Sequence, residues 1–218
     1  MLADQAWAFA PGARVLDVCT GTGHLAVAAA LAGARRVVAV DVSRRAVLAA
    51  RLNARLNGVC VDARRGDLLA PVDGERFDLV ISNPPYLPAG DGGIPARGAG
   101  RAWDAGPDGR ALLDRLIAGA PRVLAPGGTL LLVQSSVCGE TATLTALAAA
   151  GLSPRVVARR PGSLGPRLTA RAPMLEARGL LPPGRHQEEL LVISATRSTQ
   201  LLNLKRPDAL KQMLGRGH

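Results

Sequence analysis

The stretch RVLDVCTGTGHLAVAAALAG at residues 14–33 restricts the fold more than any other part of this sequence. Its first five residues, RVLDV, have the character of a buried strand, and they run through Cys-Thr-Gly-Thr-Gly into an alanine-rich helix. Glycines at such a turn let the backbone approach a ligand closely, and the helix that follows directs its first N–H groups to the same place. The stretch therefore predicts a strand–turn–helix unit of an α/β sheet with a bound cofactor.

Alternation of strands and helices continues along most of the chain. Further strands are expected at 36–40, 59–62, 77–82, 127–134, 155–159 and 189–195. Helices are expected at 24–33, from a Ser43 cap to about Asn57, at 110–120, and at 140–150 before a Gly151 C-cap. Strands rich in valine, leucine and isoleucine that alternate with helices predict a parallel sheet covered on both faces.

Three regions call for separate expectations. In the helix that follows Ser43, we expect Val47, Leu48, Leu52 and Leu56 to face the core. Residues 88–109 hold seven glycines and are expected to form a mobile loop, in which Trp103 either closes over a substrate or anchors the loop. Residues 160–187, rich in arginine and proline, are expected to connect the last two strands.

Length and charge bound the organisation of the chain. The 218 residues suit one α/β domain, expected at 1–196, followed by a basic tail at 197–218 that holds both lysines and is either disordered or helical around 207–214. No apolar run is long enough to span a membrane, the start does not resemble a secretory signal, and the three cysteines form no paired motif, so a cytoplasmic location is expected. The net charge of +10 allows a nucleic-acid partner, although the arginines are spread along the whole chain.

Acidic residues that follow the first strands are candidates for cofactor binding. Asp17 lies in the first strand, just before the glycine turn, and Asp41 ends the second strand, 24 residues later. A carboxylate at Asp41 can accept hydrogen bonds from both ribose hydroxyls of NAD or of S-adenosylmethionine, or it can order the turn before Ser43. Asp67, in GDLL, either meets an adenine edge or is an exposed turn residue.

The segment Asn83-Pro84-Pro85-Tyr86, which follows FDLVIS, is the most specific feature of the chain. Two prolines remove two N–H donors, so nearby carbonyl groups remain free as acceptors for the N–H bonds of an –NH2 group. Tyr86 offers a flat face to a planar amide or base. An amide nitrogen is a poor nucleophile, and acceptors on both N–H bonds would polarise it and aim its lone pair at a methyl donor. The segment therefore predicts N-methylation of a planar amide or amine.

With these motifs, the chain resembles the HemK-like family of class I methyltransferases, which modify the glutamine amide of peptide-chain release factors. The resemblance covers roughly residues 12–196 and rests on VLDVCTGTG, VVAVDVS, GDLL, ISNPPYLP, WDAGPDGR and LAPGGTLLLV. It implies a Rossmann-like, mainly parallel seven-stranded sheet with helices on both faces and an antiparallel last strand. It also implies S-adenosylmethionine as cofactor and a protein substrate, with a release factor as the partner.

The resemblance also assigns roles to individual residues. Thr20, Gly21, Thr22 and Gly23 would line the methionine part of the cofactor, Asp41 would hold its ribose, and Asp67 and Leu68 would flank its adenine. Asn83 would touch cofactor and substrate, and the three residues after it would complete the substrate grip. The chain departs from the family at Cys19, where the first loop glycine is usual, and it looks like the compact branch without an N-terminal helical domain.

Other functions remain open at this point. Methylation of an exocyclic amine in RNA or DNA would use the same Asn-Pro-Pro-Tyr chemistry, and the basic charge favours it. A nicotinamide-dependent oxidoreductase would explain the glycine turn but not that motif, and a protein that binds cofactor without catalysis is a further alternative. The three histidines, His24, His186 and His218, have no spacing typical of a metal site.

Overall fold

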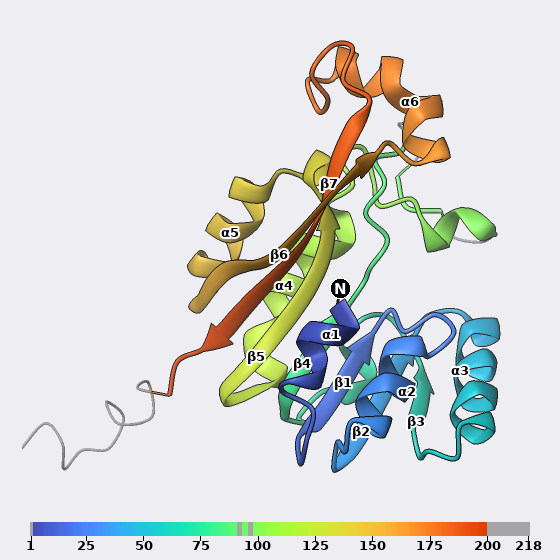
Figure 1. The fold of residues 1–218 in the computed structure, drawn as a ribbon, viewed down its shortest axis with the longest axis vertical. Helices are drawn as coiled ribbons and strands as arrows, with labels where there is room; N and C mark the ends of the chain where they lie inside the picture. The colour runs from blue at the N-terminus through green and yellow to red at the C-terminus, as the bar shows by residue number, and fades with distance from the viewer. Residues whose placement is uncertain (1, 91–92, 96–97, 200–218) are drawn as a thin grey trace, which may run out of the picture.

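The computed structural model describes residues 2–90, 93–95 and 98–199, and these form a seven-stranded sheet with strand order β3-β2-β1-β4-β5-β7-β6 (Figure 1). The strands are β1 (Arg14–Val18), β2 (Arg36–Asp41), β3 (Asp62–Arg65), β4 (Phe77–Ser82), β5 (Leu124–Ser135), β6 (Leu152–Ser163) and β7 (Gln187–Arg197). The strands β1 to β5 pair in parallel, and β7 runs antiparallel to both β5 and β6. The predicted fold, with its antiparallel last strand, is confirmed.

Helices cover both faces of the sheet. Those of the first face are α1 (Leu2–Trp7), α2 (His24–Leu31) and α3 (Arg44–Leu56), which pack with one side of β1 and β2 in one hydrophobic cluster. Those of the second face are α4 (Ala111–Val123) and α5 (Glu140–Ala149), which share another cluster with Leu16, Val38 and Val80. Because buried strand residues alternate between the two clusters, the sheet is apolar on both faces, as parallel sheets are.

The order of the strands places two sequence motifs at the same point. From β1 the chain moves outward through β2 to β3, and it then returns to the other side of β1 as β4. The carboxyl ends of β1 and β4 are therefore neighbours at a switch point of the sheet, which is where open α/β sheets bind their ligands. The Ser82 hydroxyl, at the end of β4, donates a 2.7 Å hydrogen bond to the Val18 carbonyl, at the end of β1.

The prediction of which face of α3 is buried is wrong for three of its four residues. The Ser43 side chain caps α3 by accepting from the Ala46 N–H, and Val47 is buried as predicted. Leu48, Leu52 and Leu56, however, are 54%, 57% and 73% exposed. The buried side of α3 is made by Val47, Ala50 and Ala54 instead. A Cβ atom on Gly23 would lie 2.8 Å from Ala50, so α3 packs too closely to the glycine turn for a leucine to fit between them.

Strand boundaries differ from the expectation at β3 and in the last two strands. β3 begins at Asp62 rather than ending there, and Arg64 within it binds Asp62 and Glu75. β6 and β7 are 12 and 11 residues long, so both extend well past the predicted strands. The region 160–187 is not a plain connection, because it contains the outer ends of these strands and a 12-residue helix, α6 (Pro166–Ala177), that starts with a proline at its first turn.

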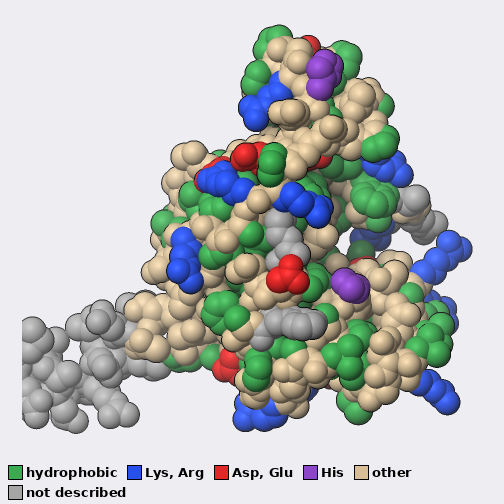
Figure 2. Space-filling view, viewed as in Figure 1, with side chains coloured by type: hydrophobic (Ala, Val, Ile, Leu, Met, Phe, Trp, Pro, Cys, Tyr) green, Lys and Arg blue, Asp and Glu red, His purple; other side chains and the backbone are tan. Residues whose placement is uncertain are grey.

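We call residues 160–187 the cap. In Figure 1 the cap projects from the sheet as the α6 helix and the crossing ends of β6 and β7, and Figure 2 shows it as a protrusion. It has a hydrophobic cluster of its own, formed by Leu87, Val137, Leu164, Leu168, Leu175 and Leu181. Because this cluster includes Leu87, the cap packs directly on the segment that follows Asn-Pro-Pro-Tyr.

The described part of 88–109 is tied to that same segment, so it is not a free loop. It contains a 3-10 turn, η2 (Ala99–Ala102), and an isolated bridge joins Leu87 to Asp104. Asp104 forms a 2.7 Å ion pair with Arg171 of α6. Residues 91–92 and 96–97, and the tail 200–218 with the helix expected at 207–214, lie outside the described residues. Within the described ranges, no helix is long and apolar enough to cross a membrane.

Candidate active site

The turn between β1 and α2 has the backbone conformation that its glycines predict. Gly21 and Gly23 have φ angles of 55° and 83°, in the left-handed region. Cys19 has a φ of 59°, a conformation that is costly for a residue with a side chain and free for glycine. This conformation explains why the family that the sequence resembles usually has glycine here. In this chain Cys19 adopts the same conformation with some backbone strain. Burial, with Asp41 nearby, raises the pKa of the Cys19 thiol to about 12, so it stays protonated.

Asp17 supports this turn from below. Its side chain is fully buried, and one oxygen accepts from the Thr20 hydroxyl at 2.5 Å and from the Ala26 N–H at 3.1 Å. The other oxygen has no hydrogen-bond partner in the described structure. Burial raises the pKa of Asp17 to about 7, although both hydrogen bonds favour the charged form. Asp17 does not line the cavity above it, so its contribution is to hold the turn.

A cavity of about 1320 Å³ opens over the turn, and we call it the loop cavity. Of the predicted cofactor residues, those that line it are Thr20, Gly21, Thr22, Asp41, Asp67, Leu68 and Asn83, whereas Gly23 lies under it against α3. The Asp41 carboxylate accepts from the Gly21 N–H at 2.9 Å and from the Ser43 N–H at 2.8 Å. The two interpretations of Asp41 therefore coincide: it orders two backbone turns and also faces the cavity.

Asp67 is a surface carboxylate with a partner. It forms a 2.5 Å ion pair with Arg115 of α4, and about half of each side chain is exposed. Leu68 next to it has a φ of 48°, so this segment also bends through the left-handed region. Both residues line the loop cavity and lie on the loop that follows β3.

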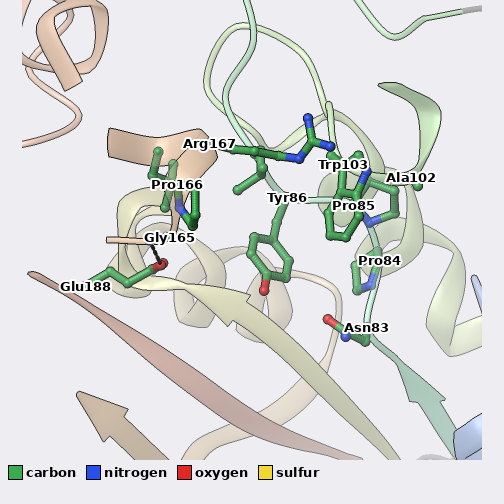
Figure 3. Close-up of a pocket in the computed structure, with 12 residues that line it drawn as sticks. Asn83, Pro84, Pro85, Tyr86, Ala102, Trp103, Gly165, Pro166, Arg167 and Glu188 are labelled. Carbon is green, nitrogen blue, oxygen red and sulfur yellow. Dashed lines mark hydrogen bonds between the residues drawn. The ribbon is translucent and has the colours of Figure 1, made fainter. Parts of the chain in front are cut away.

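A second cavity of about 380 Å³, the tyrosine pocket, lies beside the first (Figure 3). Asn83, Pro84, Pro85 and Tyr86 form one side of it, and α6 residues and Glu188 of β7 form the other. The residues that line both cavities are Asn83, Pro85, Ala102 and Trp103. The two cavities therefore meet at the Asn-Pro-Pro-Tyr segment, with the exposed Asn83 side chain at their junction.

Tyr86 is fixed by contacts on several sides. It packs against all three hydrophobic clusters, and its carbonyl accepts from the Cys138 thiol at 3.0 Å. Burial raises the pKa of the Tyr86 hydroxyl, with a smaller contribution from the nearby Glu188 carboxylate. The phenol therefore stays protonated. Because the ring is packed against three clusters, it also has a fixed position, which suits a flat surface for stacking.

The WDAGPDGR segment, residues 103–110, packs against the backbone of Tyr86 and Leu87. A Cβ atom on Gly109 would lie 2.4 Å from the Tyr86 carbonyl oxygen, so only glycine fits there. The Leu87 N–H donates to the Trp103 carbonyl at 2.8 Å, and the Leu87 carbonyl accepts from the Ala105 N–H at 3.0 Å. The two motifs are therefore one unit in space, although the sequence separates them.

Three residues at the site carried no signal that could be read in the sequence. Glu188 lines the tyrosine pocket from β7, and Arg167 lines it from α6 with its guanidinium 5.0 Å from the centre of the Trp103 ring. Ser82 joins the two strand ends. Arg167 reaches the pocket on α6 of the cap, and Glu188 reaches it on β7. A hydroxyl at a strand end is too common to be singled out.

Comparisons with known proteins agree with this geometry. Residues 5–92 match the model of the methyltransferase small domain. A candidate protein N5-glutamine methyltransferase of Methanocaldococcus jannaschii is 39% identical over 145 residues, which cover 66% of this chain and 73% of that protein. This chain belongs to the HemK-like family of methyltransferases. The recognition made from the motifs is thereby confirmed.

Other HemK-like relatives are longer than this chain. A release factor glutamine methyltransferase of Deinococcus radiodurans is 45% identical over 125 residues, which cover 55% of this chain but 44% of that protein. Among solved structures, an E. cuniculi complex described as responsible for methylation of the termination factor eRF1 has a TM-score of 0.59 and 23% identity, and covers 90% of this chain and 93% of that one. That structural likeness supports the fold.

The HemK-like geometry suits transfer between two ligands. One ligand can occupy the loop cavity beside carboxylates and backbone N–H groups, and another can stack on Tyr86 while Asn83 faces both. In the described ranges no group of three His, Cys, Asp or Glu side chains is arranged to hold a metal ion.

Proposed function

We propose that this chain methylates the side-chain amide nitrogen of a glutamine in a protein, with S-adenosylmethionine as the methyl donor. One observation carries the proposal: Asn83 and Pro85 line both the loop cavity and the tyrosine pocket, so a donor in the first can face an acceptor in the second. The domain responsible would span 1–196 together with Arg197 at the end of β7.

The residues of the loop cavity fit such a cofactor. Thr20, Gly21 and Thr22 line the cavity beside the first turn of α2, and the space around Gly21 is open. Asp41 would accept from the ribose hydroxyls, since each carboxylate oxygen keeps a lone pair beyond its bond to Gly21 or Ser43. Leu68 and Asp67 would border the adenine. When bound, the cofactor supplies an electrophilic methyl group on a sulfonium.

The residues of the tyrosine pocket would activate the amide. Asn83 Oδ1 and the carbonyl groups of the proline segment would accept hydrogen bonds from the –NH2 group, which draws electron density onto nitrogen and limits its rotation. Tyr86 would stack against the plane of the amide. A nitrogen oriented in this way needs no strong base before transfer, and the proton that leaves afterwards can pass along these acceptors to solvent.

Relatives suggest the class of partner. The names of the relatives refer to release factors and, for a protein of Bradyrhizobium diazoefficiens, to ribosomal protein uL3. A glutamine in a translation protein, foremost a release factor, is therefore the substrate we propose. Such substrates are cytoplasmic, and we place the enzyme in the same compartment.

A second candidate is methylation of an exocyclic amine in RNA or DNA. The charge of +10 favours it, as do the arginines that line the loop cavity, Arg44, Arg45, Arg65, Arg101 and Arg115. Within the tyrosine pocket the charges are mixed, because Glu188 and Arg167 both line it.

One labelling experiment tests the proposal. Purified protein and methyl-labelled S-adenosylmethionine would be incubated with release factors, with ribosomal proteins and with total RNA from a matching cell extract. Label that protease releases, and that mass spectrometry places on a glutamine side chain, is the expected result. Label that nuclease releases would replace the proposal with the nucleic-acid candidate.

A further inference from the structure

Glu188 is the one charged acceptor among the described residues that line the tyrosine pocket, and methyl transfer as proposed does not use it. The pocket around it is largely apolar, with Pro84, Leu87, Trp103 and Leu168 among its lining residues. A half-buried carboxylate in such surroundings is costly unless something polar binds it. The groups that bind it therefore decide what Glu188 can do.

Two elements hold the carboxylate in position. The Ser135 hydroxyl, at the end of β5, donates a short hydrogen bond to Oε2, and the Gly165 N–H donates to Oε1 across a long 3.4 Å. The Glu189 N–H next along the chain donates to the Ser136 hydroxyl at 3.0 Å, which fixes the backbone as well. Oε2 is thus well satisfied, whereas Oε1 has a weak partner and can accept a stronger bond from a ligand.

The position of Glu188 complements that of Asn83. In Figure 3 the Tyr86 ring lies between the side chains of Asn83 and Glu188, and Glu188 lies next to Gly165. Asn83 also lines the loop cavity. The pocket therefore offers an acceptor at each end of one flat surface. A ligand that fills it needs a donor at both ends: the –NH2 group to be methylated at Asn83, and a second N–H farther away.

A glutamine within a peptide has both donors, because its own main chain and that of its neighbours carry N–H groups a side-chain length from the amide. We propose that Glu188 is a specificity-determining residue, whose carboxylate accepts a hydrogen bond from a main-chain N–H beside the target glutamine. This inference rests on the proposed function.

The test compares Glu188→Gln with Glu189→Gln as the matched control. Glu189 lies on the next position of β7, where it pairs with Arg159 at 3.2 Å, and it does not line the pocket. Kinetic constants would be measured with a glutamine peptide of the substrate protein that the labelling experiment identifies. Each variant would also be tested with peptides in which single main-chain N–H groups near the glutamine are N-methylated.

For Glu188→Gln we expect KM for the peptide to rise by a factor on the order of five, because the amide oxygen still accepts the bond but no longer carries a charge, with kcat and Tm nearly unchanged. One N-methylated peptide should lose a larger factor with the wild type than with Glu188→Gln, whose bond to that N–H is weaker. Glu189→Gln should behave as the wild type does.

Two results would overturn the inference. An unchanged KM for Glu188→Gln, with wild-type activity intact, would contradict it while leaving the proposed function in place. An equal N-methylation penalty in the wild type and in Glu188→Gln would do the same, because the N–H would then bind elsewhere. If the wild type binds S-adenosylmethionine but methylates no glutamine in any protein or peptide, the proposed function fails first and the role of Glu188 fails with it.

Discussion

The Ser82 hydroxyl and the Val18 carbonyl are joined by a buried hydrogen bond of 2.7 Å between positions 64 residues apart. Each residue ends a strand, and each is followed directly by a motif of the site: the glycine turn after Val18 and Asn83 after Ser82. Together with the parallel pairing of β1 and β4, this bond fixes the spacing between the glycine turn and Asn83.

Ser82→Ala should lower both stability and turnover. The variant leaves a buried carbonyl with one partner fewer, which typically costs about 1–2 kcal/mol in the free energy of unfolding. Denaturant unfolding measures that loss, and kcat for methyl transfer should fall as well because Asn83 is no longer held against the glycine turn. Full activity with reduced stability would show that the bond is structural alone.

Asn83→Ala should lower kcat on the order of a hundredfold, which is the typical loss when one preorganised hydrogen-bonding group of an active site is removed. The side chain is exposed at the junction of the two cavities, so the fold should not depend on it, and Tm should stay close to that of the wild type. Steady-state kinetics and thermal unfolding check both points. Unchanged turnover would remove Asn83 from the proposed grip on the amide.

Asp41→Ala should weaken binding of S-adenosylmethionine at least tenfold by isothermal calorimetry, because two effects combine. The variant loses the acceptor proposed for the ribose, and it frees the N–H groups of Gly21 and Ser43, which the carboxylate now orders. Asp41→Asn keeps one acceptor oxygen, so its affinity for S-adenosylmethionine should lie between that of the wild type and that of Asp41→Ala. Equal affinity in all three proteins would exclude Asp41 from the cofactor site.

Gly109→Ala should abolish activity and reduce stability, because the added Cβ would lie 2.4 Å from the Tyr86 carbonyl oxygen at a φ of 76°. Gly184→Ala is a matched control: Gly184 has a φ of 71°, but nothing lies within 4 Å of an added Cβ. Gly184→Ala therefore has the backbone strain without the clash, and this strain should lower its free energy of unfolding by about 1 kcal/mol. If the two variants were equally active and equally stable, contact with Tyr86 would not be what requires glycine at position 109.

Asp17 should make stability depend on pH. Its pKa is raised from 3.8 to about 7 in the folded state, so the folded protein holds a proton that the unfolded chain releases. Stability from this group is therefore present at low pH and is lost as pH rises from about 4 to about 7. Asp17→Asn should gain stability relative to the wild type across that window. Parallel stability curves from chemical denaturation would show that Asp17 does not titrate there.

The sequence was most informative where a structure depends on neighbouring residues. The Ser43 cap, the glycine turn and the Asn-Pro-Pro-Tyr segment all have local physical causes, and each forms as predicted. The inner face of α3 was predicted wrongly because helical spacing cannot show how closely a helix packs. Contact between Gly23 and Ala50 leaves room for alanine, so the larger leucines face outward.

The tyrosine pocket could be predicted only in part, for a different reason. The proline segment was visible, but Glu188 follows it by about a hundred residues and approaches only through the antiparallel return of β7. The α6 helix was missed because Pro173 within it and the arginines around it resemble a loop composition. Pro166 at its first turn was the available signal, since proline favours that position of a helix.

The separate hydrophobic cluster of the cap has a consequence for how such enzymes diverge. Since the cap does not share the apolar interior of the two sheet faces, we expect insertions, deletions and sequence drift within it to perturb those interiors little. On the proposed function, recognition of the substrate can then change while the residues of methyl transfer are kept. Tyr86, which touches all three clusters, is the position where both kinds of evolutionary constraint meet.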